Sequence, residues 1–362
     1  MTAVELADSK RRSERGGKPR PDRFARSSAS ALRRRSIRGS SASALRRRSI
    51  RGWIAARLLR VLSAVLQRLP DGPLHRVAHL IGGLLYRIQP QRRRLVRGNL
   101  ERVVHSLAAR DMGGERVAAA ARDPRALDGL VRDAFGHYVR GYLEGAILPA
   151  YARAERLARV QPDDPAQVEH AFGNATDPAR QSPLIIVGLH FGALEIPGLW
   201  ATKMLGRQIT APMETIGDPD LQSYFERSRR GTGLNVIPVE KAATELRASL
   251  AKGGAVGLVA DRPVGGSGTP VELFGAPARL PVGPAVLALE SGAAVWLIAT
   301  RRIGSNQYRA RIEEIVVPTD GTRRERLSAF LAAQSVAFER AIADAPEQWW
   351  TAFFPIWDDI RA

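Results

Sequence analysis

Apolar residues recur at three- and four-residue spacing from position 53 to about 105, which predicts amphipathic helices. Pro70-Asp71-Gly72-Pro73 interrupts the pattern, and further helices are expected at 74–88 and near 95–107. The apolar positions of the first helix are Trp53, Ile54, Leu58, Leu59, Leu62, Val65, Leu66 and Leu69. Because arginines flank these apolar faces, the helices suit a membrane interface as well as packing on a domain core, and both interpretations stay open.

The segment 111–128 is charged and rich in alanine, and we interpret it as a linker or surface segment. A helix is expected again over 130–151, ending near Pro149. Together these segments predict a helical N-terminal part covering 53–150.

From residue 183 onward the pattern changes, and short runs rich in β-branched residues alternate with helical ones. Strands are expected at 184–189, 209–211, 235–238, 255–260, 295–300 and 308–315. Helices are expected at 196–204, 219–232, 242–252, 284–291 and 323–345. This alternation predicts an α/β fold, in which helices cover a central, mostly parallel or mixed sheet. The sheet-bearing core would occupy 183–358, inside a single domain of 53–362.

Residues 1–52 differ from the rest in composition. They hold 16 Lys and Arg against 4 Asp and Glu, a net +12 of the chain's +19, and few large apolar residues, which predicts a disordered arm. A 13-residue sequence occurs twice without change, at 27–39 and 40–52. A recent duplication or a misplaced start codon explains the repeat without function. Alternatively, the arm binds anionic lipid, or the phosphates of nucleic acid without sequence preference.

Several classes of protein are excluded by what the sequence lacks. Without cysteine there is no disulfide, no cysteine-ligated metal and no cysteine nucleophile. No apolar run reaches the roughly 18 residues of a spanning helix. A secretory signal peptide is not expected, because the first residues lack its apolar region. Contact with a membrane is therefore expected to be peripheral.

The segment from Pro183 to Glu195 concentrates the candidate chemistry. A buried strand is predicted to end at His190, and Glu195 follows five positions later. The carboxyl end of a strand opens into the crevice where α/β sheets bind ligands. A histidine with a nearby carboxylate can take a proton from a hydroxyl at neutral pH, so Glu195 is expected to orient the imidazole of His190. The alternative is that His190 has a structural role and no part in catalysis.

Other catalytic signatures are missing from the sequence. There is no G-x-S-x-G elbow and no Walker A loop, and Gly231-Thr232-Gly233 lacks the third glycine of a dinucleotide fingerprint. A metal site is not expected, because no second histidine lies at ligand spacing from His190.

The stretch His190-Phe191-Gly192-Ala193-Leu194-Glu195 resembles the H-x-x-x-x-[D/E] box of the bacterial lysophospholipid acyltransferase superfamily. It is most similar to the branch of the lipid A lauroyl/myristoyl and phosphatidylinositol mannoside acyltransferases. Four further matches follow the family's order: the run 92–100, the arginine-bearing helix 225–231, the segments 259–262 and 274–284, and the P-E-Q-W box 346–350. The residues of the third match, 259–262 and 274–284, favour a phosphatidylinositol mannoside acyltransferase or a generic relative. The resemblance covers roughly 53–358 and leaves out the arm.

The resemblance implies a glycerolipid-acyltransferase-like enzyme seated peripherally on the cytoplasmic face of the bacterial cell membrane. His190 would be the general base and Glu195 its partner. A hydroxyl of a membrane lipid or glycolipid would attack the thioester of an acyl-CoA or acyl carrier protein directly, with no acyl-enzyme and no cofactor. The substrate-binding candidates are Arg229, Arg230, Asp261, Arg262 and Glu214.

Four of these candidates also have a structural alternative. Arg229 and Arg230 suit a solvated helix face, and Asp261 with Arg262 suits a pair that fixes a loop. The aromatic tail at 349–357 suits core packing as well as an acyl channel or an interfacial belt.

Two further functions stay open at this stage. The chain could be a nucleic-acid- or anionic-lipid-binding protein that acts through its basic arm, although the body lacks basic-aromatic RNA signatures and no specific nucleic acid is expected. It could also be an inactive member of the family kept as a scaffold, against which the intact His/Glu pair argues.

Overall fold

The computed structural model describes residues 50–68, 71–148, 157–173, 182–263 and 268–360. The arm and its repeat therefore lie outside the described residues, apart from residues 50–52, which begin the first helix.

The N-terminal part is helical, as its apolar spacing predicted. Its helices are α1 (Ile50–Leu66), α2 (Asp71–Ile88), α3 (Pro90–Ala108), α4 (Gly114–Arg122) and α5 (Pro124–Ala146). The expected linker at 111–128 was wrong, because α4 and the start of α5 lie in it. Val117 and Ala120 of α4 are buried in the core, and the Asp123 side chain caps α5 by accepting from the Arg125 N–H. A short alanine-rich helix depends on that packing, which sequence does not show.

The centre of the fold is a seven-stranded sheet with the order β1-β9-β8-β2-β5-β3-β4. All of its neighbouring strands run parallel except β8 and β9, so the expected mostly parallel, mixed sheet is confirmed. The strands are β1 (Val160–Pro162), β2 (Leu184–Gly188), β3 (Ile209–Met213), β4 (Leu234–Pro238), β5 (Ala255–Val259), β8 (Ala294–Arg302) and β9 (Tyr308–Glu314). The sequence did not predict β1 or the separate hairpin of β6 (Thr269–Leu273) and β7 (Ala276–Leu280).

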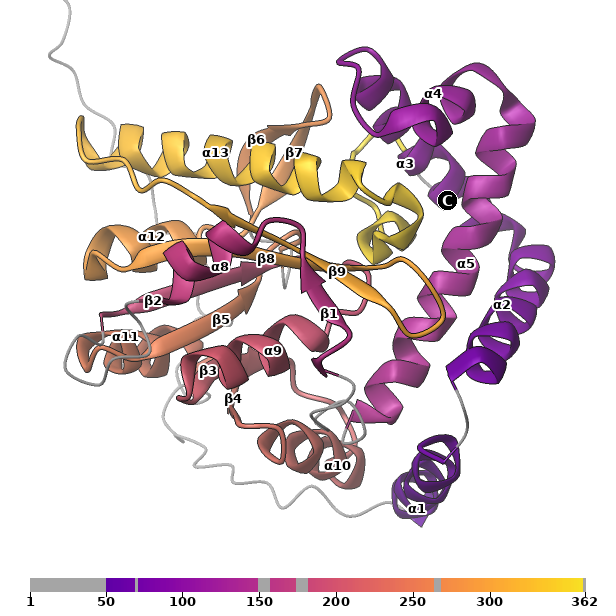
Figure 1. The fold of residues 1–362 in the computed structure, drawn as a ribbon, viewed down its shortest axis with the longest axis horizontal. Helices are drawn as coiled ribbons and strands as arrows, with labels where there is room; N and C mark the ends of the chain where they lie inside the picture. The colour runs from indigo at the N-terminus through magenta and orange to yellow at the C-terminus, as the bar shows by residue number, and fades with distance from the viewer. Residues whose placement is uncertain (1–49, 69–70, 149–156, 174–181, 264–267, 361–362) are drawn as a thin grey trace, which may run out of the picture. The chain divides into compact units, whose positions relative to one another are not determined.

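Helices cover both faces of the sheet (Figure 1). Side chains alternate along each strand, so Ile185 and Val187 join one apolar cluster while Leu184 and Ile186 join another. The first cluster includes α11 (Ala242–Ala251), α12 (Gly283–Ser291), α13 (Arg323–Ala343) and the N-terminal helices. The second includes α8 (Pro165–Phe172) and α9 (Ile196–Leu205). A further helix, α10 (Pro219–Arg230), precedes β4.

Helices α2 and α5 cross in close contact, and a glycine on each makes this possible. A Cβ atom added to Gly82 would lie 2.5 Å from the backbone nitrogen of Gly136. Near this crossing, Arg302 of β8 donates to Glu144 of α5 from Nε at 2.9 Å, and Arg140 donates to the same carboxylate at 3.0 Å. The helical part is thus joined to the sheet by buried charges as well as by apolar packing.

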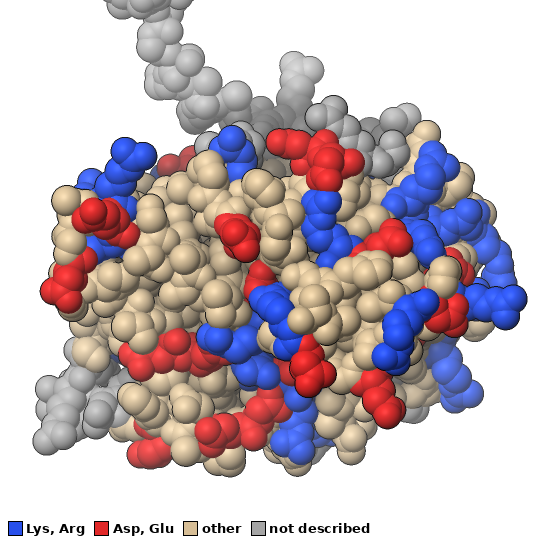
Figure 2. Space-filling model, turned by 90° about the horizontal axis from the view of Figure 1, so that it is seen from above, with Lys and Arg blue, Asp and Glu red and all other residues tan. Residues whose placement is uncertain are grey.

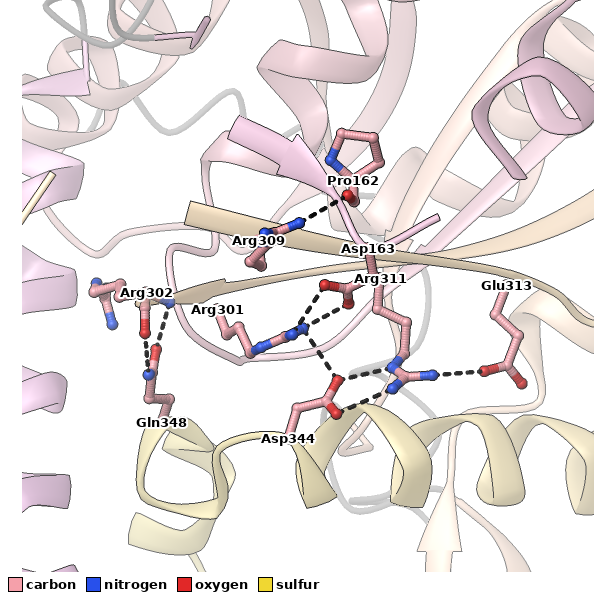
Figure 3. Close-up of polar contacts among 9 residues, drawn as sticks. All are labelled: Pro162, Asp163, Arg301, Arg302, Arg309, Arg311, Glu313, Asp344 and Gln348. Atoms are coloured by element: carbon pink, nitrogen blue, oxygen red, sulfur yellow. Dashed lines mark hydrogen bonds and ion pairs between the residues drawn. The ribbon is translucent and has the colours of Figure 1, made fainter. Parts of the chain in front are cut away.

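Charged pairs also fasten the edge of the sheet, as Figure 3 shows. Arg301 of β8 donates to Asp163, which follows β1, at 2.6 and 2.9 Å. Arg311 of β9 donates to Asp344 at the end of α13 at 2.8 and 3.0 Å, and Arg301 reaches the same carboxylate at 3.2 Å. The network orients β1 and α13 against β8 and β9, although pairs this close to solvent stabilise little individually.

Acidic and basic side chains are interspersed on the face seen in Figure 2. Among the described helices, none is both long enough and apolar enough to cross a membrane.

Candidate active site at the carboxyl end of the sheet

His190 and Asp261 meet because the strands that precede them are neighbours. Strand β2 ends at Gly188 and β5 ends at Val259, and these two residues are paired in the parallel register. Both strands leave the sheet at the same edge, so the side chains two positions further on, His190 and Asp261, face each other. His190 Nδ1 lies 2.7 Å from Asp261 Oδ1, and the backbone N–H of His190 donates to Oδ2 at 3.1 Å.

The Asp261 carboxylate is buried and fully hydrogen bonded. Besides His190, it accepts from the indole Nε1 of Trp349 at 3.0 Å and from the Thr351 hydroxyl at 2.6 Å. Its side chain is 1% exposed. Burial alone raises the pKa of this carboxyl, but its electrostatic attraction to His190 and the hydrogen bonds from His190, Thr351 and Trp349 outweigh burial and lower the pKa below its ordinary value.

An ionised Asp261 fixes the proton of the neutral imidazole on Nδ1, because a carboxylate can only accept. Nε2 of His190 is then the ring nitrogen that can take a proton. The side chain is 25% exposed and lines a cavity, so this nitrogen is within reach of a bound molecule. This geometry would let His190 act as a general base, with the buried Asp261 carboxylate orienting the ring and stabilising its charged form.

The loop after His190 depends on a glycine. Gly192 has φ +52°, and a Cβ atom there would lie 2.0 Å from the backbone oxygen of Thr300 in β8. The Gly192 N–H donates to Gln348 O at 2.9 Å and the Ala193 N–H donates to Thr300 O at 2.9 Å. The loop is thus pressed between β8 and the C-terminal segment, which leaves no room for a side chain at this position.

The P-E-Q-W segment braces this loop from the other side. It forms the short helices η4 (Pro346–Gln348) and η5 (Trp350–Phe353). The Gln348 side chain accepts from the Arg302 N–H and donates to its carbonyl, both at 2.9 Å (Figure 3), and the Trp350 N–H donates to His190 O at 2.7 Å. Sequence reasoning missed this positioning role. The signal available was the run of hydrogen-bonding side chains 347–351 just after the last helix.

Three aromatic side chains of the tail pack in the core. Trp349 and Trp357 are 1% exposed and Phe353 is 3% exposed. None of the described aromatic residues of this tail lines the cavity, so the structure favours core packing over an acyl channel at these positions.

Glu195 does not pair with His190 as the sequence predicted. It stands at the start of α9, where it accepts from Arg229 of α10 through Nε at 3.2 Å and through Nη2. The Arg229 Nη1 also contacts the sulfur of Met213 at 2.8 Å. The physical reason is that the loop carries Glu195 away towards α10, while β5 places a carboxylate directly beside the imidazole. Glu195 still lines the same cavity as His190.

The remaining candidates separate into two groups. Arg262 and Glu214 both line the cavity and are paired at 3.3 Å, and the Arg262 guanidinium lies 4.7 Å from the centre of the Phe354 ring. Arg230 is not among the cavity-lining residues; its side chain is 57% exposed and pairs with Glu226 at 3.7 Å. Arg230 therefore has the solvated helix-face setting that was its structural alternative.

The cavity has a volume of about 420 Å³ and lies between α9 and the sheet. That size is within the range of small-molecule sites. Among the described residues, five charged or titratable side chains line it, and most of the remaining lining is apolar. The five are His190, Glu195, Glu214, Arg229 and Arg262. Within the described residues, no three His, Cys, Asp or Glu side chains are arranged to hold a metal ion.

Fold and site together place the molecule among α/β proteins that bind ligands at the carboxyl edge of their sheet. The chain belongs to the bacterial lipid A biosynthesis acyltransferase family, whose model matches residues 128–355. This range includes His190, Asp261 and the bracing C-terminal segment.

Two mycobacterial relatives are similar over part of the chain. A phosphatidylinositol mannoside acyltransferase of Mycolicibacterium smegmatis is 30% identical over 173 residues, which are 47% of this chain and 55% of that protein. A phosphatidylinositol mannoside acyltransferase of Mycobacterium tuberculosis is 34% identical over 110 residues, 29% of this chain and 34% of that protein. The chain thus matches about half the length of the first relative and a third of the second.

Proposed function

We propose that this protein is a membrane-associated O-acyltransferase that moves a fatty acyl chain from a thioester to a hydroxyl of a lipid or glycolipid. The observation that carries the proposal is the His190–Asp261 pair at an otherwise largely apolar cavity. The base can activate an alcohol, and the cavity can shield an alkyl chain from water. Family membership supports the same class of reaction.

The proposed reaction is a direct transfer. His190 Nε2 takes the proton of the acceptor hydroxyl, and the oxygen attacks the thioester carbonyl carbon. Asp261 stabilises the imidazolium that forms. The tetrahedral intermediate then collapses, the carbon–sulfur bond breaks, and the imidazolium returns the proton to the leaving thiolate. The products are the ester and the free thiol of coenzyme A or of acyl carrier protein, with no covalent acyl-enzyme and no cofactor.

Arg229 is the proposed source of positive charge for the developing oxyanion, because it lines the cavity and is oriented by Glu195. Burial alone lowers the pKa of Arg229, but the adjacent Glu195 outweighs it and raises the pKa above its ordinary value, so the guanidinium stays charged. Arg262 and Glu214 are proposed to contact the polar part of a substrate at the same cavity.

The proposed acceptor is a phosphatidylinositol mannoside, since that is the substrate named for both mycobacterial relatives. The Arg262 guanidinium suits the phosphodiester of such a lipid. The proposed donor is an acyl-CoA or an acylated carrier protein, and the assay described below uses each in turn.

The proposed membrane-binding surface is formed by α1 and α2. These helices expose apolar side chains to solvent, with Leu80 at 74% and Leu58 at 64%. The others are Val61, Leu62, Val65, Val77, Ile81, Leu84 and Ile88. Exposed arginines accompany them, including Arg60, Arg76 and Arg87. Apolar side chains beside cations suit insertion at the surface of an anionic bilayer, and we propose peripheral binding at the cytoplasmic face of the cell membrane.

The function is tested with purified protein, a phosphatidylinositol mannoside acceptor in anionic vesicles, and either acyl-CoA or acylated carrier protein as donor. The wild type should form an acceptor bearing one additional acyl group, detected by mass spectrometry. His190→Ala should abolish the product, while Arg230→Ala, at a solvated helix face, serves as the matched control. Full activity in His190→Ala would contradict the proposal.

Membrane binding is tested separately by vesicle flotation. Leu80→Glu with Leu58→Glu should reduce binding to anionic vesicles without changing the unfolding temperature, because both side chains are exposed. Unchanged flotation would contradict the proposed surface.

A further inference from the structure

Two central strands carry a glycine on the face of the sheet that borders the cavity. Gly188 ends β2 and Gly257 lies in the middle of β5, and both line the cavity. The register pairs Gly257 with Ile186 and Gly188 with Val259. Glycine weakens a strand interior, since it has no side chain to pack, and often marks a place where a ligand approaches the backbone.

The space above each glycine differs. A Cβ atom at Gly188 would find its nearest neighbours at 3.8 Å (Ile298 O) and 4.0 Å (Leu258 O), so a methyl group there enters open cavity. A Cβ atom at Gly257 would lie 3.2 Å from Ile209 Cγ2 and 3.9 Å from Ala211 Cβ. The hollow at Gly257 is therefore narrower and is bounded by Ile209.

The two glycines lie at different depths from the base. Gly188 precedes His190 by two residues, whereas Gly257 is level with Ile186, two residues further from the carboxyl edge. At about 3.3 Å per residue, this step is roughly 7 Å. The lining around Gly257 is aliphatic, while the charged side chains come from the loops and from α10. The aliphatic members around this depth are Ile186, Ile209, Ala211, Leu234 and Val236.

We propose that the acyl chain of the donor lies over Gly188 and then Gly257, and that Gly257 with Ile209 limits the chain length that the protein accepts. This inference rests on the proposed function. An alkyl chain whose thioester lies at His190 passes Gly188 first, whatever its length. Only a longer chain reaches Gly257. A side chain at the first position therefore affects every donor, and a side chain at the second discriminates by length.

The test is a series of saturated acyl thioesters of increasing length with one acceptor, assayed as kcat/KM. Gly257→Ala should lose about tenfold or more with the longest accepted donors, the discrimination expected for one methyl group in an apolar pocket, and stay near wild type with short ones. Gly188→Ala should lose activity with all donors. Gly129→Ala is the matched control, because Gly129 is exposed on α5 and nothing lies within 4 Å of an added Cβ atom.

A second variant acts in the opposite direction. Ile209→Ala removes the Cγ2 methyl group that bounds the hollow, and should raise the relative use of the longest donors. It keeps the proposal testable if Gly257→Ala does not fold. Equal loss at all chain lengths, or an unchanged profile in both variants, would overturn the length role. If kcat/KM of the variants depended on the length of the acyl chains of the acceptor and not on that of the donor, the cavity would hold the acceptor. That result would overturn the assignment of the cavity to the donor.

A binding assay separates this inference from the proposed function. Free fatty acids of the same lengths should displace a fluorescent fatty acid from the wild type, and Gly257→Ala should weaken binding of the long ones selectively. Absence of transfer with this binding pattern intact would refute the proposed reaction alone. Transfer with a binding pattern independent of length in the wild type would refute the inference alone.

Discussion

His190 Nδ1 lies 2.7 Å from Asp261 Oδ1, although 71 positions separate the two residues in the sequence. The contact exists because β2 and β5 are neighbours in the sheet while β3 and β4 lie beyond β5. The same carboxylate also accepts hydrogen bonds from the Trp349 indole and the Thr351 hydroxyl, so one buried charge connects His190 to the C-terminal segment. Asp261 is thereby the partner of His190 in the folded protein.

Asp261→Asn should lower kcat by about 10³- to 10⁴-fold, since the amide removes the charge that stabilises the imidazolium and favours the wrong tautomer. The variant retains the size of the side chain. The measurement is steady-state transfer with one donor and acceptor, alongside circular dichroism to verify folding.

Glu195→Gln is the matched comparison. Glu195 contacts Arg229 rather than the imidazole, so its neutral amide should cost at least about tenfold less in kcat than the Asp261 substitution. If the ranking is reversed, Glu195 is the functional partner of His190 and the assignment from the geometry is wrong.

Much of the fold could be predicted from the periodicity of the sequence. The strands that border His190 and Asp261 are continuous apolar runs, and buried parallel strands have that pattern. The sequence does not predict that β2 and β5 are adjacent in the sheet, because strand order depends on how helices pack across the sheet. The sequence therefore predicts Asp261 as a substrate-binding residue but not as the partner of His190, for which it favours Glu195, the nearer carboxylate in the chain.

The missed elements share a weak apolar signal. Strand β6 contains a proline and only Leu273 of it is buried, while β1 is three residues long. Helix α4 buries only Val117 and Ala120. Such short segments are stabilised by the core that they contact, which sequence periodicity does not reveal.

Gly192→Ala should destabilise the loop after His190 by about 2 kcal/mol or more, because the residue has φ +52° and its side chain would collide with the backbone of β8. Activity should fall as well, since the loop carries His190. The measurements are the denaturant midpoint and kcat of one preparation. Gly83→Ala provides the control, because nothing lies within 4 Å of an added Cβ atom there. A Gly192→Ala protein with wild-type stability would show that the loop can move away from Thr300.

Acid should weaken the contact between α2 and α5. Burial and the nearby Arg140 lower the pKa of His75 to about 4, and burial lowers the pKa of His79 and of His137 as well. The rings of His75 and His79 are tilted with their centres 4.3 Å apart, and those of His79 and His137 meet edge to face at 5.2 Å. Arg140 Nη1 donates to His75 Nδ1 at 2.8 Å, which requires a neutral ring.

Proton binding sets the direction of the pH effect on stability. Between about pH 6.5 and 4 the unfolded chain binds more protons at these histidines than the folded chain does. The contribution of the neutral histidines to the free energy of unfolding is therefore fully present above about pH 6.5 and is lost as the pH falls. His75→Gln keeps an acceptor for Arg140 but cannot titrate. It should reduce the acid-dependent loss by about 1–2 kcal/mol, after allowance for the partly exposed ring. The measurement is urea unfolding at pH 7.5 and pH 4.5, and an identical pH dependence in both proteins would contradict this interpretation.

Glu144→Gln should destabilise the protein by about 3–5 kcal/mol, because it leaves Arg302 buried without its counter-charge. Burial alone raises the pKa of Glu144, but Arg302 and Arg140 outweigh it and lower the pKa, so the carboxylate is ionised at neutral pH. The contribution of ionised Glu144 to the free energy of unfolding is present above the ordinary pKa of a carboxyl group, and it is lost as the pH falls below that pKa. Urea unfolding at pH 7 measures the loss. Glu290→Gln, which affects only exposed pairs with Arg247 and Arg323, should leave the midpoint unchanged. A small effect of Glu144→Gln would mean that water reaches Arg302, and that apolar packing alone joins α5 to β8.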